Sequence, residues 1–548
     1  MAFRVKLEGM ASRLTVGSRR LFFQGSIVLA LAVLAVVAAS NMARLERWHE
    51  VPHACDWFGF LRQAKLFRDN GFFGGLDTAV RDANSLYLID RMKRLEPANP
   101  LLAGQTGPFC HWYHVRTDRL AIVSPPGTGF GLSLFAEGIE ARAAFMAYTM
   151  LVFAGLAALV ASARFWTVPW ITATFGVIVL LGMFRFNADW SIQPTVPLAV
   201  LSAYFSMRLV ESAERRSGAL WAIAFGLCVG LAVNARLLNV LLAAGIFICL
   251  GVLFLRQPRW RPVRLAALSA VSIIVGALPT LAANTINAGH FWTPTYGPGN
   301  SRAFSLGWDN IASGLRYYVV EHQTVAVLAA GALALLVLLF ATHRRLAVGS
   351  ARESATAGII VLVLNFAFAA IYINRLPYLP FPALVYAQSM VSLLLIRAQN
   401  QGAAVNRWYV DISPWFGPAV AAVAIAAVAG FALDRAARLP VSPNYTRPDI
   451  DFTIPARAIV WATTTGGYYY LFLDRQSGSL YFGPGEQDRI MAAIAADGVP
   501  QFVVRDYGNE ALVRRLQSEG AVALAGRAFG AEVYAFGRRP QSSAEPEG

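Results

Sequence analysis

Residues 218–235 read GALWAIAFGLCVGLAVNA and contain no charged side chain. Wound as an α-helix, such a stretch is long enough to cross the ~30 Å hydrocarbon core of a bilayer. Because a chain in lipid must satisfy its backbone hydrogen bonds internally, stretches of this kind span membranes as helices. We expect eleven such spans, at residues 25–43, 142–163, 167–184, 193–210, 218–235, 237–255, 265–285, 323–341, 356–373, 380–397 and 415–433. The sequence therefore predicts an α-helical polytopic membrane protein.

The composition supports this class. Apolar residues make up 56% of the chain and charged residues 14%, with a mean hydropathy of +0.48. A soluble globular domain carries about a quarter charged residues. The formal net charge is +15, but nucleic-acid binding requires a basic stripe with interleaved aromatic residues. The chain has no such stripe, so we expect no nucleic-acid partner.

The arginines indicate the orientation, because cytoplasmic loops carry the excess of basic residues in membrane proteins. One set of alternate loops holds Arg4, Lys6, Arg13, Arg19, Arg20, Arg164, Arg208, Arg215, Arg216, Arg256, Arg259, Arg261, Arg264, Arg344, Arg345, Arg352, Arg397 and Arg407. The opposite short loops hold only Arg185, Arg236, Arg302, Arg316 and Arg375. The N-terminus is therefore expected in the cytoplasm, and an odd number of spans places the C-terminal tail on the outer face.

The organisation that follows has four parts. Residues 1–24 form a cytoplasmic N-terminus, and 25–435 form the membrane domain, with a large first outer loop at 44–140. Residues 440–540 follow a proline-rich linker, and 541–548 are expected to be a disordered tail. The first span is longer than the apolar region of a signal peptide and lacks a convincing cleavage site, so we expect it to remain as an anchor.

Residue usage indicates the compartment. The 47 basic residues include only three lysines, Lys6, Lys65 and Lys93, and alanine is abundant. This is typical of a GC-rich bacterial genome, which predicts a multi-pass protein of the bacterial inner membrane with a periplasmic outer face.

The four cysteines fall into two pairs. Cys228 and Cys249 lie within expected spans, where cysteine acts as a small apolar side chain. Cys55 and Cys110 both lie in the first outer loop, where an oxidising compartment would allow them to form a disulfide.

The C-terminal part shows a different pattern. Short apolar runs at 458–462, 501–504 and 532–536 alternate with helical patterns at 467–474, 488–496 and 511–519. Such alternation predicts a small periplasmic α/β domain of about 100 residues. It contains neither a GxGxxG nor a Walker-type loop, so we expect it to cap the membrane part and shape the acceptor side rather than bind a nucleotide.

The first outer loop carries the main candidate for chemistry. It begins with HACDWFGFLRQAK at residues 53–65, which predicts a short amphipathic helix with Asp56 at its head. An acidic residue next to a membrane span is costly unless it is paired or has a function. Asp56 could also cap this helix, since Asp is a favoured N-cap residue, and capping is compatible with catalysis.

Further outer-face segments supply aromatic residues, single arginines and a second acid. They are SPPGTGFGL at 124–132, RFNADWS at 185–191, NAGHFWTPTYG at 287–297 and YINRLPYLP at 372–380. A guanidinium pairs bidentately with a phosphate, and aromatic faces stack on pyranose rings. Structural alternatives stay open: Asp189 could pair with Arg185, Arg375 could snorkel to the membrane interface, and Arg236 could be held by a structural partner.

The order of these motifs resembles a known family. A D-x-x-x-x-L-x-x-A-x-x-x-x-x-x-G pattern runs from Asp56 to Gly71, and a P-P-G turn follows at 125–127. The series is completed by an acidic loop after the third span, by N-x-x-x-F-x-x-P-x-Y-G at 287–297, by N-R-x-x-x-x-P at 374–380 and by the tail at 460–470. Over nearly the whole chain this resembles the GT-C superfamily of integral-membrane glycosyltransferases, near the bacterial protein mannosyltransferases and lipid A aminoarabinose transferases.

The resemblance implies an inverting transfer of a sugar from a polyprenyl-phosphate donor to an acceptor glycan, lipid or protein on the periplasmic face. Asp56 would be the general base, and Asp189 would match a second acidic position. Arg375, with Arg236 and Lys65 as further candidates, would bind the donor phosphate. The residues expected to line the substrate pocket are Trp57, His111, His114, Tyr296 and Tyr378.

One departure from the family pattern bears on metals. Many members carry two adjacent acids in the first loop, whereas here Trp57 follows Asp56. A divalent cation would require clustered carboxylates, so we expect no metal and no cofactor. The spacing of His111 and His114 can also occur in metal sites, but a pocket position is preferred here.

Two other classes of function stay open. The first is a membrane transporter or lipid flippase, although such proteins typically have inverted repeats and helices broken near the membrane midplane, and the sequence contains no internal repeat. The second is a non-catalytic assembly protein of the cell envelope, in which Asp56 would be dispensable.

Overall fold

The computed structural model describes the chain in segments. These are residues 55–99, 102–108, 110–137, 191–256, 258–296, 305–341, 350–373, 376, 378–400, 450–463, 476–478, 484–506 and 508–537, with a few positions between 140 and 151. The expected spans at 25–43, 167–184 and 415–433, most of 142–163, and the two terminal segments lie outside these residues. The expected helix at 467–474 does so as well.

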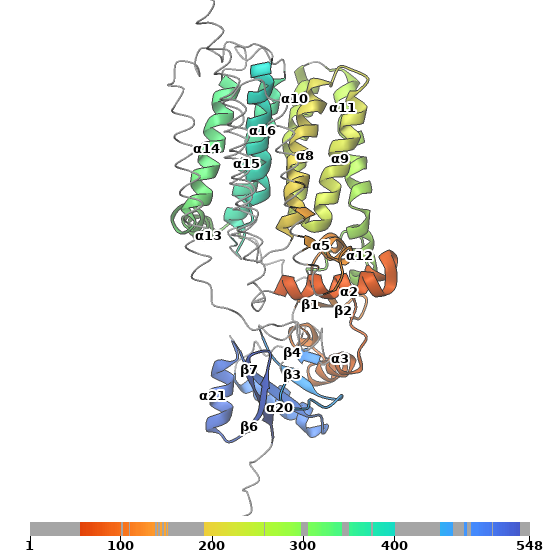
Figure 1. The fold of residues 1–548 in the computed structure, drawn as a ribbon, viewed down its shortest axis with the longest axis vertical. Coiled ribbons are helices and arrows are strands. Elements are labelled where there is room, and N and C mark those ends of the chain that lie inside the picture. The colour runs from red at the N-terminus through yellow and green to blue at the C-terminus, as the bar shows by residue number, and fades with distance from the viewer. Residues whose placement is uncertain are drawn as a thin grey trace, which may run out of the picture.

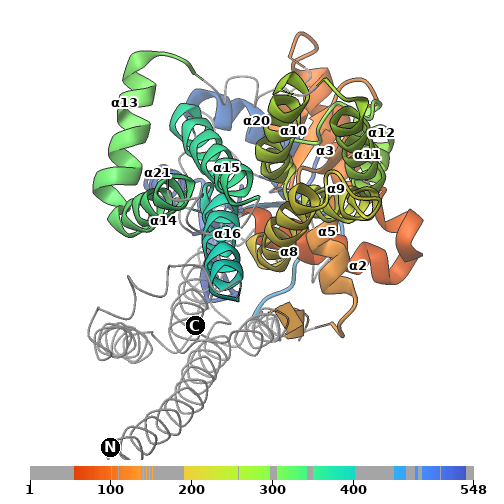
Figure 2. The same cartoon turned by 90° about the horizontal axis from the view of Figure 1, so that it is seen from above.

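The described helices of the membrane part lie side by side as a bundle (Figure 1). They are α8 (Ile192–Glu211), α9 (Gly218–Ala235), η1 (Leu237–Ala243), α10 (Ala244–Arg256), α11 (Trp260–Gly276), α12 (Leu278–Ala288), α13 (Trp308–Arg316), η3 (Tyr317–Glu321), α14 (Gln323–Ala341), α15 (Ala351–Ile371) and α16 (Phe381–Asn400). Seen from above, α13 and α2 lie on opposite sides of the bundle (Figure 2). Small residues such as Ala199, Ala222 and Ala357 are fully buried in its core, which permits the close helix packing usual in membranes.

Length and composition agree with the expected spans. Among the described residues, three helices are long and apolar enough to cross a membrane: Gly218–Ala235, Leu237–Arg256 and Ala351–Ile371. The number rises to five if each of two bent helix pairs counts as one span. Helix α8 occupies the expected span at 193–210 and packs in the same core, although it is outside this set.

One expected span is corrected by the structure. The run at 265–285 was expected to be a single helix, but α11 and α12 meet at a bend of 53°. Pro279 occupies the first turn of α12 and has no N–H to continue the α11 pattern. The side chain of Asn234 in α9 fills the break, accepting from Thr280 N at 3.0 Å and donating to Gly276 O at 2.7 Å.

A second bend precedes α14. The helix Trp308–Glu321, which includes the π-turn η3, meets Val325–Ala341 at 94°. The expected span at 323–341 is therefore helical, but the helix that leads into it, α13, lies at the edge of the bundle (Figure 2).

The first outer loop folds across one end of the bundle, called here the loop end (Figure 1). It contains α2 (Cys55–Gly75), α3 (Ala83–Leu95), α4 (Leu102–Gln105), the hairpin β1 (His111–His114) and β2 (Arg119–Ile122), and α5 (Pro126–Ser133). Helix α2 is kinked at Gly71, whose φ of 69° and ψ of −176° are available almost only to glycine.

The C-terminal part forms a five-stranded sheet with the order β4-β3-β5-β7-β6. The strands are β3 (Ile459–Trp461), β4 (Gln476–Gly478), β5 (Gln501–Arg505), β6 (Val522–Ala528) and β7 (Ala531–Phe536), with helices α20 (Pro484–Ala496) and α21 (Glu510–Ser518). Strand β3 runs parallel to β4 and β5, whereas β7 is antiparallel to β5 and β6. Strands β3, β5 and β7 and both helices coincide with predicted elements, but β4 and β6 were not predicted.

This sheet unit is attached to α3 of the first outer loop. Leu88 and Met92 of α3 share a hydrophobic core with Trp461 and Ile490. Three polar contacts surround this core: Asn84 Nδ2 donates to Ala456 O at 2.8 Å, Tyr87 OH donates to Asp497 Oδ2 at 2.7 Å, and Arg91 Nε lies 3.0 Å from the same carboxylate oxygen. The C-terminal sheet therefore packs on the side of the loop that faces away from the bundle (Figure 1).

The Asn234 contacts predict a stability difference. Replacing Asn234 with Ala would leave buried groups of Gly276 and Thr280 without partners, at a cost of about 1–3 kcal/mol. Asn365→Ala is the matched control, because Asn365 is equally buried but donates only to Val361 O of its own helix. In detergent, Asn234→Ala should lower the thermal unfolding midpoint clearly more than Asn365→Ala does. Equal losses would contradict the role of Asn234 in joining the broken helices.

Candidate functional site

The loop end brings α2, α5 and the end of α9 into close contact. A Cβ added to Gly127 of α5 would lie 2.7 Å from the backbone of Asn234, and one added to Gly129 would lie 2.5 Å from Gln63 Oε1 of α2. The P-P-G motif therefore begins a short helix whose glycines allow two neighbours to approach. This packing fixes α2, which carries Asp56, against the bundle.

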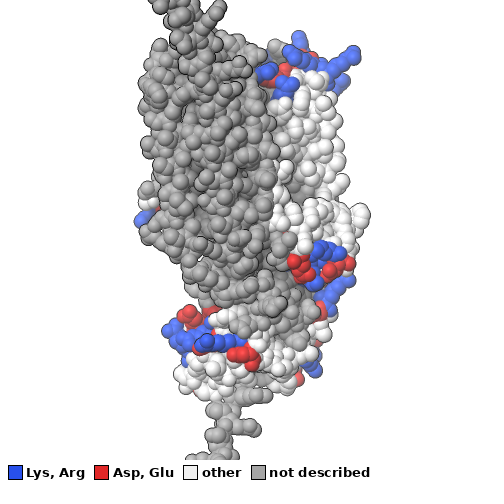
Figure 3. Space-filling model, viewed as in Figure 1, with Lys and Arg blue, Asp and Glu red and all other residues white. Residues whose placement is uncertain are grey.

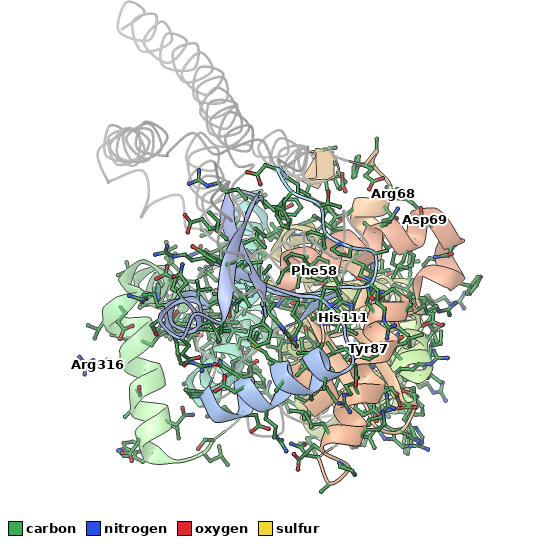
Figure 4. All side chains as sticks on the ribbon, turned by 90° about the horizontal axis from the view of Figure 1, so that it is seen from below. Phe58, Arg68, Asp69, Tyr87, His111 and Arg316 are labelled. Carbon is green, nitrogen blue, oxygen red and sulfur yellow. The ribbon has the colours of Figure 1, made fainter. Side chains whose placement is uncertain are left out.

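Arg62 joins α2 to the rest of the loop. Its side chain is buried, and its Nη1 donates to Thr78 O at 2.8 Å and lies 2.6 Å from His111 Nε2, while Nη2 donates to Ala79 O at 3.3 Å. Since a guanidinium only donates, His111 accepts this hydrogen bond through Nε2. Phe58 packs beside this ring, with centroids 5.8 Å apart (Figure 4).

The same end of the bundle places Arg236 next to Tyr378. Arg236 is in extended conformation between α9 and η1, and its guanidinium carbon lies 4.9 Å from the centre of the Tyr378 ring. This is a cation–π contact, in which a guanidinium keeps its charge while its plane is held in place. Two predicted residues from distant segments are thus brought together, and this cation is positioned at the loop end.

The surroundings of Lys65 differ from those of Arg236. Its ammonium forms an ion pair with Asp69, one turn along α2, at 3.2 Å. Both side chains are about half exposed and lie on the wall of a cavity of about 630 Å³. Arg236 and Tyr378 do not line this cavity. The described geometry therefore does not group Lys65 with Arg236.

The two predicted histidines are buried in the β1 strand. His111 accepts from Arg62, whereas His114 Nε2 is buried and has no hydrogen-bond partner. Burial lowers the pKa of His114 from 6.5 to about 4, because the charged form would lose its hydration. Both histidine side chains therefore pack between the β1–β2 hairpin and the elements around it. Among the described residues, no three His, Cys, Asp or Glu side chains are grouped so as to hold a metal ion.

The 287–297 segment contacts the first outer loop. Thr295 Oγ1 donates to Val123 O at 2.7 Å, directly after β2, and Asn287 accepts from Thr78 N at 3.0 Å and donates to Leu76 O at 2.8 Å. Tyr296, half-buried, follows Thr295 and is thereby placed beside the loop. Two of the segments that were expected on the outer face therefore lie in contact.

The structure describes several of the predicted site residues only in part or not at all. Asp56 and Trp57 belong to the first turn of α2, but only their backbone is described; Asp189 and Arg375 lie outside the described residues. Cys110 is disulfide-bonded, and Cys228 and Cys249 are free. The side chain of Cys55 is not among those described, so its bridge to Cys110 stays a prediction.

Arg62 is the residue that the sequence analysis missed. Its position one helical turn after Phe58 places it on the buried face of α2. An arginine on the buried face of a helix requires several acceptors, and this is the signal that could have identified it.

The buried His114 predicts a pH dependence of stability. The unfolded side chain takes up a proton below pH ~6.5, whereas the folded one stays neutral to about pH 4. The free energy of unfolding should therefore decrease as the pH falls from 6.5 to 4, by at most about 3 kcal/mol. Thermal unfolding at pH 7 and pH 4.5 would measure this loss. His114→Gln should reduce it, whereas the half-buried His290→Gln should retain it; identical pH profiles for His114→Gln and the wild type would contradict the prediction.

Comparisons with known proteins give the fold. No protein-family description matches the chain, and no curated protein matches it. Among solved structures, ArnT from Cupriavidus metallidurans bound to undecaprenyl phosphate superposes with a TM-score of 0.52 at 15% identity, covering 95% of this chain and 99% of that chain. ArnT in the apo state gives a TM-score of 0.43 at 14% identity, covering 84% and 94%. The chain therefore shares, over nearly its whole length, the fold of ArnT bound to undecaprenyl phosphate.

Proposed function

We propose that this protein is an inverting glycosyltransferase that moves a sugar from a polyprenyl-phosphate donor to an acceptor, with Asp56 as the general base. The observation that carries the proposal is the arrangement of the loop end. The α2 turn that contains Asp56 lies across the same end of the bundle as the Arg236–Tyr378 pair. A fold shared with ArnT, whose structure contains undecaprenyl phosphate, supports this reading.

The chemistry assigns one task to each group. Asp56 takes the proton from an acceptor hydroxyl as its oxygen attacks the anomeric carbon of the donor sugar. The bond from that carbon to the phosphate oxygen breaks, and the polyprenyl phosphate leaves with the electron pair. A single displacement inverts the configuration at the anomeric carbon.

The leaving phosphate needs a cation positioned in advance. Arg236 provides a permanently charged guanidinium held on the Tyr378 ring. Arg375 is proposed as a second cation for this phosphate, and Asp189 as a second acid that binds or orients the reacting groups. Lys65 is reassigned to the cavity described below.

The proposed location is the bacterial inner membrane, with the loop end on the periplasmic side. Arginines gather at the opposite end of the bundle, over the ends of α10 and α11 (Figure 3). Arg208 and Arg397 pair there with Glu211, and Arg259 pairs with Glu214. Such an excess of basic residues favours the cytoplasmic side.

A lipid transporter is the second candidate, and one observation favours it. Two helices of the bundle are broken, by 53° and 94°, and broken helices are typical of transporters. In transporters the breaks lie near the membrane midplane, whereas α12 and α13 both lie at the loop end (Figure 1). Breaks at the membrane surface position outer-face groups, so we prefer the enzyme.

The general-base proposal predicts a defect in transfer. Asp56→Asn should lower the rate of sugar transfer from a radiolabelled polyprenyl-phosphate sugar by about 10²–10⁴-fold, because the proton acceptor is lost. Binding of the donor lipid should be retained. Asp90→Asn is the control, since Asp90 is an exposed acid on α3 that pairs with Arg94. Transfer by Asp56→Asn at the wild-type rate would refute this mechanism, and wild-type protein that moves lipid without transferring sugar would favour the transporter.

The phosphate-binding role predicts a defect in donor binding. Arg236→Ala should weaken the binding of undecaprenyl phosphate by about tenfold or more, since a charge-assisted contact contributes about 1.5–3 kcal/mol. Arg316→Ala is the matched control, because Arg316 is also an arginine at the loop end but lies on the opposite side of the molecule from α2 (Figure 4). Equal affinities of the two variants would show that Arg236 does not contact the phosphate.

A further inference from the structure

A second feature of the loop end is the cavity on the flank of α2. Its volume of about 630 Å³ lies within the range of about 300–1,000 Å³ that small-molecule sites occupy. One wall is the second half of α2, the opposite wall is the segment that leads from α2 into α3, and Ile286 of α12 contributes an apolar patch. The proposed transfer chemistry leaves this cavity unused.

The charges of the cavity balance. Its ionisable lining consists of the cations Arg62, Lys65 and Arg81 and the carboxylates Asp69, Asp77 and Asp82. The carboxylates already neutralise their neighbours: Lys65 pairs with Asp69 at 3.2 Å, and Asp77 pairs with Arg81 at 2.7 Å and with Arg119 at 3.3 Å. A phosphate would require an excess of cations. A neutral ligand with many hydroxyl groups instead finds both donors and acceptors here.

Two further groups point to the same ligand class. Phe73 is 83% exposed on the cavity wall and is held edge-on against Phe72, with ring centroids 5.4 Å apart. Such a ring offers an apolar face to a sugar. Asp82 uses Oδ1 to cap α3 by accepting from Ser85 N at 2.8 Å, whereas its Oδ2 is buried and has no partner. An unpaired carboxylate oxygen requires a donor, which a sugar hydroxyl can supply.

The placement on α2 sets the size of the ligand. Asp56 and Lys65 lie on the same helix, and nine residues at 1.5 Å each separate them by ~14 Å along its axis. A single sugar ring does not cover that distance. A ligand that reaches from the cavity to Asp56 must therefore be an extended chain of several rings.

We propose that this cavity binds a neutral sugar residue of an oligosaccharide acceptor, away from the reacting end. The assignment of the bound glycan as acceptor rests on the proposed function, whereas the binding of neutral glycans follows from the cavity itself. Phe73 stacks on the ring, and Asn70, Asp82 and the Asp69–Lys65 pair bond its hydroxyl groups.

The test uses the full-length protein in nanodiscs on an array of neutral di- to hexasaccharides, with sialylated and phosphorylated glycans and free inorganic phosphate as anionic probes. We expect neutral chains to bind, and the longer ones to bind more tightly. Phe73→Ala should weaken their binding by about tenfold, and Asp82→Asn, which keeps the helix cap, by several-fold. Trp308→Ala is the control, since Trp308 is an equally exposed aromatic residue on α13.

Several outcomes would overturn the proposal. These are binding of anionic probes alone, no binding of neutral chains, and equal binding by Phe73→Ala and the control. Transfer of labelled sugar is measured on the same samples. If neutral glycans bind in a way that depends on Phe73 but receive no sugar, the proposed function is refuted and the assignment of the cavity stands. If no neutral glycan binds and Phe73→Ala leaves sugar transfer unchanged, only the assignment of the cavity is refuted.

Discussion

The arrangement of the loop end depends on hydrogen bonds from buried side chains to backbone groups that have left a helix. A backbone N–H or C=O that is buried without a partner is costly, and most of all beside a membrane. Asn234 meets this requirement at the break between α11 and α12, Asn287 meets it for the chain after α2, and Arg62 meets it for Thr78 and Ala79. Asn234 thus joins α9 to the broken helices within the bundle, Arg62 joins parts of the first outer loop, and Asn287 ties that loop to the bundle.

The second constraint is close packing through glycine. Gly127 and Gly129 bring α5 against Asn234 and Gln63, so α2 lies directly on the end of the bundle. Asp56 and the Arg236–Tyr378 pair are thereby carried on elements that share one rigid support. The proposed site for a lipid donor and an acceptor requires its groups to be held in this way.

Part of this arrangement could be predicted from the sequence, and the reasons differ by element. The run at 218–235 is apolar throughout, and its helix α9 has the predicted bounds. The break at residues 276–278 was missed because Pro279 stands in an equally apolar run, and the buried Thr280 N–H that the break frees is satisfied by Asn234, 46 residues away. Strand β6 was missed because alanine and glycine favour strands poorly. Its pairing with β7, with a bulge between Leu524 and Gly526, determines its conformation.

The arrangement of the candidate site could likewise be predicted only in part. The motifs indicated that Arg236 and Tyr378 belong to the outer face, and the structure brings them into contact. They did not include the pairing of Lys65 with Asp69, although residues four apart on one helix are neighbours and the spacing could have indicated it. Arg62 was missed because a buried arginine is recognised only by the carbonyls that surround it.

The junction between α3 and the C-terminal sheet has a consequence for biogenesis. Asn84 bonds Ala456 across 372 residues of sequence, and Leu88 and Met92 are covered by residues that are synthesised after every helix of the bundle. Contacts of such long sequence separation form late in folding. The apolar face of α3 therefore stays uncovered while the ribosome makes the membrane part. Transiently exposed apolar surface of this kind makes a folding intermediate prone to aggregate, and a chain truncated before residue 450 would keep that face exposed.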